Sequence, residues 1–206
     1  MNRLFLVLWI GCNCWAQAVA PSVGRSADAF LTAPYEVPRA TPTGPPVSVS
    51  QLQHKLSKQT LKAYQHAIKL SRAGEHEKAA SELEVAVRQE PAFSPARNRL
   101  GVEYAYLERW ADAQSAFRRT IEMDPNYWSA HYNLGLLLYT IGDLSEAEQS
   151  TRRALQLSGE NPQAHLFLGE LLLLRGGRRA EALAEIHFAA RTIPEARRVL
   201  RNLGDR

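Results

Sequence analysis

One pattern of small and bulky residues occurs twice in the centre of this chain. Leu100-Gly101 recurs 34 residues later as Leu134-Gly135. A fixed period of this length is typical of stacked helical hairpins, because one such unit cannot bury its apolar face alone and must pack on a neighbour. The period therefore predicts an all-α array of repeated helix–turn–helix units.

The residues inside one copy explain how a hairpin would form. Each copy contains two segments of about a dozen residues with helical apolar spacing, which is too long for strands. Gly101 and Ala113 lie where the two helices would cross, so their small side chains allow a close approach. Asp124-Pro125 ends the second helix, because the residue before a proline disfavours the α conformation.

The spacing resembles that of the tetratricopeptide repeat family, and the resemblance extends outward to four copies. The positions that carry it are Ala67, Gly74, Ala79, Ala86 and Pro91 in residues 60–93; Leu100, Gly101, Tyr104, Ala113, Phe117 and Pro125 in residues 94–127; Leu134, Gly135, Gly142, Ala147 and Ala154 in residues 128–161; and Leu168, Gly169, Gly176, Ala182, Ala189 and Pro194 in residues 162–195. The resemblance implies a right-handed superhelical array of about four helix–turn–helix repeats within residues 50–203. An amphipathic segment, residues 195–203, would then form a C-terminal capping helix, since terminal repeats need a polar outer face.

Four positions depart from the family pattern without shifting its phase. Ala67 replaces the first glycine of the first repeat, and Glu108 stands where the second repeat would have its turn glycine. Thr151 replaces an aromatic residue, and Gly159 replaces the proline of the third repeat.

The N-terminal residues are typical of an export signal. A short basic start precedes the apolar run 4–10, and Ala18 ends a small-x-small cleavage site. We expect residues 1–18 to be a signal peptide of bacterial type, which places the protein in the periplasm or cell envelope. Ile10-Gly11-Cys12 resembles a lipobox, so the alternative is a lipoprotein acylated at Cys12, and membrane association is expected only in that case.

Residues 19–49 differ in composition from the rest. They contain six of the eleven prolines, mixed with serine, threonine and glycine, and predict a disordered, semi-rigid tether. Ser48 or Ser50 could cap a helix that runs on to Arg72. Alternatively, Ser57 starts a fresh helix and residues 50–56 are a short lead-in.

No catalytic or cofactor-binding pattern is found in the sequence. His66 and His76 are ten residues apart, and His131 and His165 occupy equivalent repeat positions, so the histidines do not suggest a metal site. A nucleophile elbow, a phosphate-binding glycine loop and a paired-cysteine motif are missing. We therefore expect a non-enzymatic protein without a metal or another cofactor.

In this family, function lies on the concave face, formed chiefly by the first helix of each repeat. Aligning the copies places on it Tyr64, Gln65 and Ile68; Asn98, Arg99, Val102 and Tyr106; Tyr132, Asn133, Leu136 and Tyr139; and Leu166, Phe167 and Glu170. Aromatic rings supply contact area, and asparagine and arginine can bond a peptide backbone or its carboxylates. Several of the rings could instead pack between repeats. The family's clamp for C-terminal carboxylates is not implied, because Arg99 is the only cation at the matching positions.

The leading hypothesis is an exported scaffold that binds a peptide or protein segment in its groove. The alternative is a structural component of an envelope complex, assembled end to end or through the cap helix.

The sequence has eight arginines from Arg175 onward, so this part of the chain could meet an anionic partner or simply be solvated. Interleaved base-stacking aromatics are missing, so nucleic acid is not an expected partner. The sequence favours neither a monomer nor an oligomer.

Overall fold

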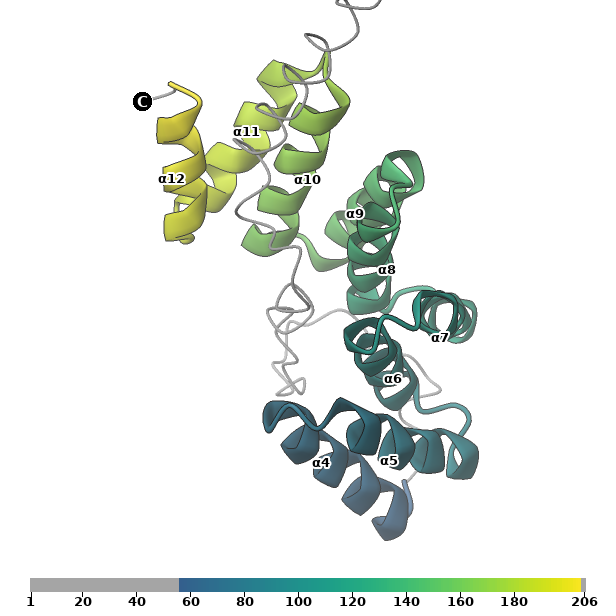
Figure 1. Cartoon of the computed structure of the whole chain (residues 1–206). Helices are drawn as coiled ribbons and strands as arrows, with labels where there is room; N and C mark the ends of the chain where they lie inside the picture. Colours follow the sequence, from purple (N-terminus) through teal and green to yellow (C-terminus); the bar gives the residue numbers. More distant parts are fainter. Residues whose placement is uncertain (1–55, 205–206) are drawn as a thin grey trace, which may run out of the picture.

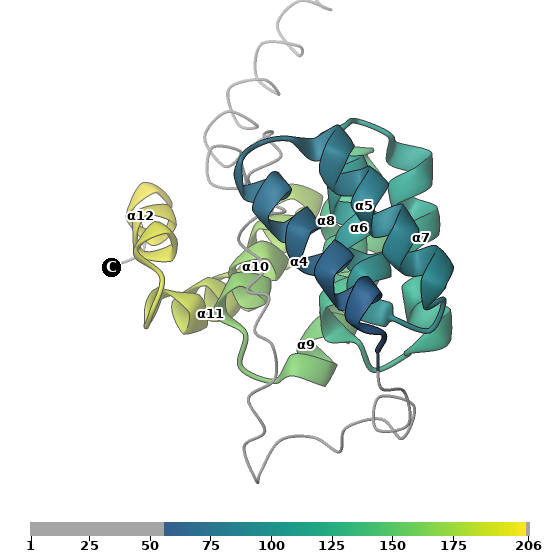
Figure 2. The same ribbon diagram turned by 90° about the horizontal axis from the view of Figure 1, so that it is seen from below.

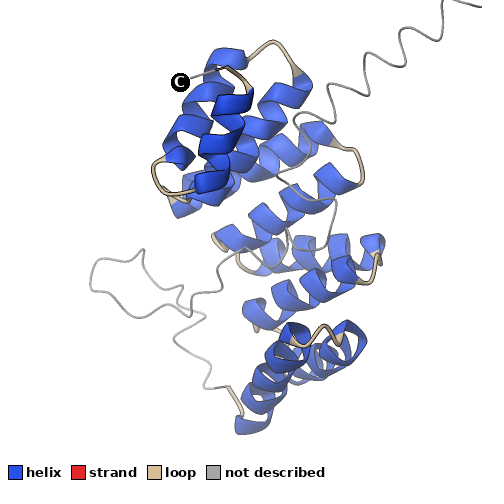
Figure 3. Cartoon of the chain, turned by 60° about the vertical axis from the view of Figure 1, so that its left-hand side comes forward, coloured by secondary structure: helices blue, strands red, loops and turns tan. Residues whose placement is uncertain are grey.

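The computed structural model describes residues 56–204, which form α-helices joined by short turns (Figures 1 and 3). The helices are α4 (Lys58–Arg72), α5 (His76–Gln89), α6 (Ser94–Tyr106), α7 (Trp110–Met123), α8 (Trp128–Thr140), α9 (Leu144–Ser158), α10 (Pro162–Arg175), α11 (Arg179–Ala190) and α12 (Pro194–Asn202). The expected signal peptide (1–18), tether (19–49) and first part of the lead-in, with Ser48 and Ser50, lie outside the described residues.

The helices pack as four consecutive antiparallel hairpins: α4 with α5, α6 with α7, α8 with α9, and α10 with α11. The first helix of each later hairpin also packs on the second helix of the hairpin before it, and α12 closes the array against α11. The stack follows an arc, with the first and last hairpins at its two ends (Figure 1). The predicted all-α fold class of about four repeats and a capping helix is confirmed.

Glycines allow the two helices of a hairpin to approach closely in three repeats. A Cβ atom added at Gly101 would lie 2.6 Å from the Phe117 ring, and one at Gly169 would lie 2.4 Å from Ile186. At Gly135 the nearest atom would be Thr151 Oγ1, at 2.7 Å. The missing aromatic ring at position 151 therefore leaves this crossing just as tight, because the smaller threonine fills it.

The turn inside the second hairpin shows the cost of one departure from the repeat pattern. Gly74, Gly142 and Gly176 follow the C-terminal ends of α4, α8 and α10, and they take positive φ angles of 77°, 91° and 75°. Glu108 occupies the equivalent place in the second hairpin with φ 56°, the one non-glycine residue of the described range with a positive φ. A side chain makes this conformation unfavourable, so the turn is kept by the packing around it.

The first described helix starts at Lys58. The Ser57 side chain caps it, accepting a hydrogen bond from the Thr60 backbone N–H at 3.0 Å. Of the two alternatives for this region, a fresh helix after Ser57 is therefore the one observed. Each of the helices between residues 58 and 202 is too short or too polar to cross a bilayer.

Candidate functional site: the inner face of the array

The inner face consists of α4, α6, α8 and α10, the first helix of each hairpin. α6 contacts α8 directly, as expected for helices on the inside of a curved stack, in addition to the contacts through α7. All the groove residues expected from the sequence lie on these four helices. The predicted residues thus all belong to the first helices of the four hairpins.

Burial divides the predicted residues into two groups. Buried side chains are Tyr64, Asn98, Val102, Tyr132, Asn133, Leu136, Phe167 and Glu170. Gln65 is exposed, and Ile68, Arg99, Tyr106, Tyr139 and Leu166 are half-buried. Packing between repeats, the second interpretation of these rings, therefore accounts for part of the set in this structure.

Two asparagines join neighbouring inner helices at the centre of the face. Asn133 Nδ2 on α8 donates to Asn98 Oδ1 on α6 at 3.1 Å, and the two residues are 1% and 7% exposed. Asn133 Oδ1 is buried and accepts no hydrogen bond within the described chain. A buried acceptor without a donor costs about 1–3 kcal/mol. This oxygen is closed to solvent, so it can accept an N–H from a bound chain only after the Asn133 side chain turns toward the inner surface.

Aromatic rings form the wall between α8 and α10. Phe167 meets Tyr132 and Tyr139 edge to face, with ring centroids 6.0 and 5.8 Å apart. Burial, followed by the charge of Glu170, raises the pKa of Tyr132, so its hydroxyl stays protonated at neutral pH. This wall is apolar, with Tyr139 partly accessible at its edge.

A polar cluster closes the junction between the first two repeats, and we call it the first-junction cluster: Ser71, His76, Arg99, Glu103 and Tyr106. Glu103 is fully buried and pairs with Arg99 Nε at 3.1 Å and with His76 Nδ1 at 2.8 Å. Arg99 also donates to Ser71 Oγ at 2.7 Å, and His76 stacks on Tyr106 with centroids 4.3 Å apart. The predicted cation of the groove is therefore already neutralised by a carboxylate of its own helix.

Glu103 was not predicted as a functional or structural residue, although the sequence carries a signal for it. The equivalent positions of the next two repeats hold Leu137 and Leu171, both 0% exposed. A glutamate among such positions has to find a cation when the repeats stack. Comparison of the copies at this position would have indicated a buried ion pair.

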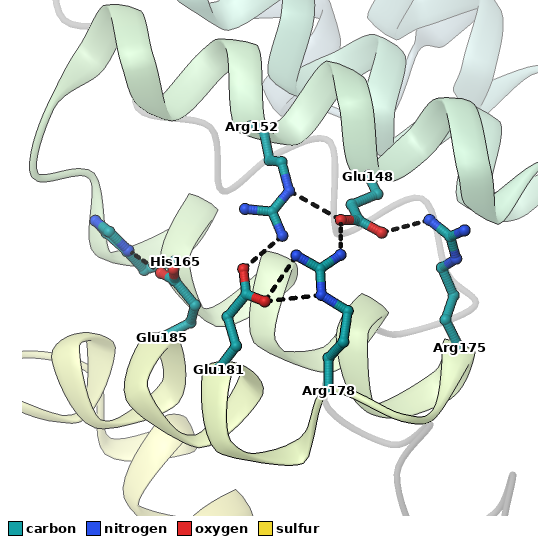
Figure 4. Close-up of polar contacts among 7 residues, drawn as sticks. All are labelled: Glu148, Arg152, His165, Arg175, Arg178, Glu181 and Glu185. Carbon is teal, nitrogen blue, oxygen red and sulfur yellow. Dashed lines mark hydrogen bonds and ion pairs between the residues drawn. The ribbon is translucent and has the colours of Figure 1, made fainter.

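A second cluster joins the third and fourth repeats, and we call it the third-junction cluster: Glu148, Arg152, Arg175, Arg178 and Glu181 (Figure 4). Glu148 accepts from Arg152 Nε at 2.8 Å and Arg178 Nη1 at 2.6 Å, and also from Arg175. Glu181 accepts from Arg152 Nη2 at 2.6 Å and Arg178 Nε at 2.8 Å. Burial alone would raise the pKa of Glu148. Hydrogen bonds and charge from Arg152 and Arg178 outweigh this effect and hold the pKa below its usual value.

His66 and His165 each pair with a single carboxylate, whereas His131 Nε2 contacts the Pro125 carbonyl oxygen at 3.0 Å. His66 contacts Glu82 at 3.1 Å, and His165 contacts Glu185 at 2.5 Å (Figure 4). Over residues 56–204, no three metal-ligating side chains come together.

Comparison with known proteins agrees with this geometry. Residues 98–165 match the family profile described as tetratricopeptide repeat, and no curated protein sequence matches the chain. Among solved structures, TTC0263, a thermophilic TPR protein of Thermus thermophilus, is similar with a TM-score of 0.62 and 25% identity, over 71% of this chain and 82% of that one. MamA from Desulfovibrio magneticus RS-1 has a TM-score of 0.63 at 19% identity, over 72% and 84%.

A third similar structure holds a ligand. The first TPR of Spaghetti (RPAP3), bound to the HSP90 peptide SRMEEVD, has a TM-score of 0.54 at 20% identity, covering 56% of this chain and 91% of that one.

Proposed function

We propose that this chain is a tetratricopeptide repeat protein, as the profile match over residues 98–165 and the helical hairpins indicate, and that it is a non-enzymatic scaffold that holds an extended segment of another protein along its inner face. The observation that carries the proposal is the buried Asn133 amide oxygen, which lacks a donor and lies next to α6. An extended peptide presents backbone N–H groups that can satisfy such an acceptor. The neighbouring aromatic wall offers apolar contact beside it.

The chemistry of the face also limits the ligand. Arg99 is paired with Glu103 and Ser71, so this cation is not available to grip a terminal carboxylate. The acidic peptide SRMEEVD bound by the Spaghetti domain is therefore a weak guide to the charge of the ligand here. We propose a segment of low charge with bulky apolar side chains, suited to the half-buried Ile68, Tyr139 and Leu166.

A binding experiment with matched variants tests this proposal. The full chain is panned against a displayed library of random peptides, and the enriched peptides are measured against Asn133→Leu. This change keeps the number of side-chain heavy atoms but removes the acceptor, together with the donor to Asn98. Loss of one buried hydrogen bond to the ligand should weaken binding about 3- to 10-fold. Gln149→Leu replaces an exposed amide side chain on α9 by leucine, outside the inner face, and serves as the control.

Circular dichroism would confirm that both variants stay helical. Equal binding by the wild type and Asn133→Leu would remove the central role of Asn133, and failure to enrich any peptide would contradict a groove for extended segments.

We further propose that the scaffold is exported, on the strength of the basic start, the apolar run and the cleavage pattern of residues 1–18. Mass spectrometry of the protein recovered from cells would separate the possibilities. A start at residue 19 supports the signal peptide, an acylated Cys12 supports the lipoprotein, and an intact Met1 contradicts both.

Assembly through the ends of the array is the alternative function. It is less consistent with the charges, because exposed cations cover both the first helix, α4, and the last, α12. Like charges would repel when two copies meet end to end. Sedimentation over a range of concentrations tests this, since a constant monomer mass would exclude self-assembly.

A further inference from the structure

The first helix of the array carries exposed lysines at two positions where the later repeats bury alanine, leucine or the ion-paired Glu103. Two positions of each later inner helix face the preceding hairpin and are 0% exposed: Ala96 and Glu103, Ala130 and Leu137, and Ala164 and Leu171. The equivalent residues of α4 are Lys62 and Lys69, and both are exposed. Figure 2 looks onto this end of the array, with α4 nearest the viewer.

These lysines belong to a longer row, which we call the basic stripe: Lys58, Lys62, Lys69 and Arg72. At 3.6 residues per turn and 1.5 Å per residue, the four positions fall within about 80° of arc and span about 21 Å along α4. All four side chains are exposed, and α4 contains neither aspartate nor glutamate. The stripe is therefore a straight row of positive charge on the open end of the array.

The stripe is not neutralised by the part of the chain that the structure describes. None of its four side chains makes an ion pair or hydrogen bond with the rest of residues 56–204. On the outer helix α7, by contrast, the exposed Arg118 and Arg119 pair with Glu146 and Glu122. Like charges three and four residues apart on a helix destabilise it. A solubilising cap would be served equally well by mixed charges, so the uniform sign points to an external anion.

We infer that the basic stripe is a docking surface for anionic lipid headgroups. A row of lysines needs no shape complementarity to bind a layer of phosphates, and each basic residue near such a surface contributes to adsorption. A stable protein partner would instead require an apolar core, and lysine is depleted from such interfaces. Leu61, which is 42% exposed, is the one large apolar side chain of α4 that faces solvent.

The position of the stripe in the chain fits this role. α4 is the described helix that follows residues 1–55, in which the sequence predicts an export signal or an acylated cysteine. A segment that brings the chain to a membrane would deliver α4 there first. The inference is independent of what the inner face binds.

Vesicle flotation with the full chain tests the inference. The quantity measured is the ratio of binding to vesicles of equal parts phosphatidylcholine and phosphatidylglycerol over binding to pure phosphatidylcholine, so that any apolar attachment of residues 1–55 cancels. The triple variant Lys58→Gln, Lys62→Gln and Lys69→Gln should lower this ratio about 10- to 100-fold, at roughly 1 kcal/mol for each basic residue near the surface. Raising the salt concentration should lower the wild-type ratio as well.

A matched variant on the other end removes the same charge. Arg197→Gln, Arg198→Gln and Arg201→Gln alters three exposed arginines of α12 and should leave the ratio within about twofold of the wild type. The substitution of the same three lysines by arginine keeps the charge and should bind like the wild type, which guards against a folding defect in the glutamine variant.

Three results would overturn the inference. Equal losses in the α4 and α12 glutamine variants would mean that only net charge matters, and a wild-type ratio near one would mean no lipid preference. Binding to soluble polyglutamate that depends on the stripe, with no vesicle preference, would assign it to an acidic protein instead.

Discussion

The first and third junctions of this array perform the same task with opposite environments. At the first junction a fully buried glutamate, Glu103, sits between Arg99 and His76. At the third junction Glu148 and Glu181 bond arginines that are between a third and a half exposed, with side-chain exposures of 33% for Arg152 and 45% for Arg178. Both clusters hold consecutive hairpins together, but only the first is sealed from water.

This difference separates two kinds of interaction that a contact map would treat alike. A buried ion pair cannot be replaced by water when one partner is removed, so its loss is costly. Partly exposed arginines turn to solvent when their carboxylate is lost, and salt screens what they contribute. The first junction should therefore be rigid and salt-insensitive, and the third should respond to ionic strength and pH.

The largest expected effect is that of Glu103→Ala. It leaves Arg99, only 15% exposed at its side chain, without its carboxylate, and should cost about 3–5 kcal/mol of unfolding free energy. Because stability in repeat arrays depends on neighbours, the first hairpin should open first. Hydrogen exchange would show faster exchange in α4 and α5 with α8 to α11 unchanged, and uniform loss across the array would contradict a local junction.

At the third junction, Glu148→Ala should cost about 1–2 kcal/mol, because the freed arginines can be hydrated. Denaturant unfolding at low and high salt measures this, and the difference from the wild type should shrink as salt is added. A cost equal to that of Glu103→Ala, with no salt dependence, would abolish the contrast between the two junctions.

Acid should affect the third junction through Glu148. Its pKa is held below the ordinary value of 4.5 in the folded protein, so its stabilising contribution is complete above that value and is lost as the pH falls through the folded pKa. The wild type should therefore lose stability more steeply than Glu148→Gln as the pH falls below 4.5. Thermal unfolding over a series of acidic buffers checks this, and parallel curves would assign the acid sensitivity to other carboxyl groups.

A smaller effect is expected from Tyr104→Phe, which belongs to the contact between α5 and α6. The Tyr104 hydroxyl donates to Glu84 Oε1 at 2.9 Å, and its loss should cost about 0.5–1.5 kcal/mol. Chemical denaturation measures the change in unfolding free energy. Tyr139→Phe removes a tyrosine hydroxyl on α8, in the other half of the array, and serves as the comparison.

The smallest effect should be a gain. Glu108→Gly relieves the positive φ at the turn of the second hairpin and should stabilise the array by about 0.5–1 kcal/mol. The reciprocal change at the equivalent turn of the third hairpin, Gly142→Glu, should destabilise it. Melting temperatures that shift in the same direction for both variants would show that backbone strain is not the cause.

Much of the fold could be predicted because its determinants are local and repeated. Gly101, Gly135 and Gly169 indicated the helix crossings, and α6, α8 and α10 begin at Ser94, Trp128 and Pro162. Ser57 was one of two possible helix starts, and its capping hydrogen bond identifies it as the start observed. These features depend on residues within one repeat or on the period between copies.

The candidate site was predictable only in outline. The period placed Asn98 and Asn133 on the same face, but their mutual hydrogen bond and the acceptor left over depend on how far α6 lies from α8. Arg99 looked like a ligand-binding cation because its partner, Glu103, was not compared with the buried leucines at the equivalent positions of later repeats. Lys62 and Lys69 of the basic stripe became informative once their equivalents in later repeats were found to be buried.

The sequence by itself determined that this protein is a row of helical hairpins, because small and bulky residues at a fixed spacing admit few other ways to bury apolar surface. Tertiary structure alone decided which polar side chains are neutralised and which remain available. Helix propensity and spacing act along the chain, whereas the pairing of charges is set by distances between residues that lie in different repeats. Glu103 and Lys69 hold equivalent positions, yet one is sealed between hairpins and the other faces solvent.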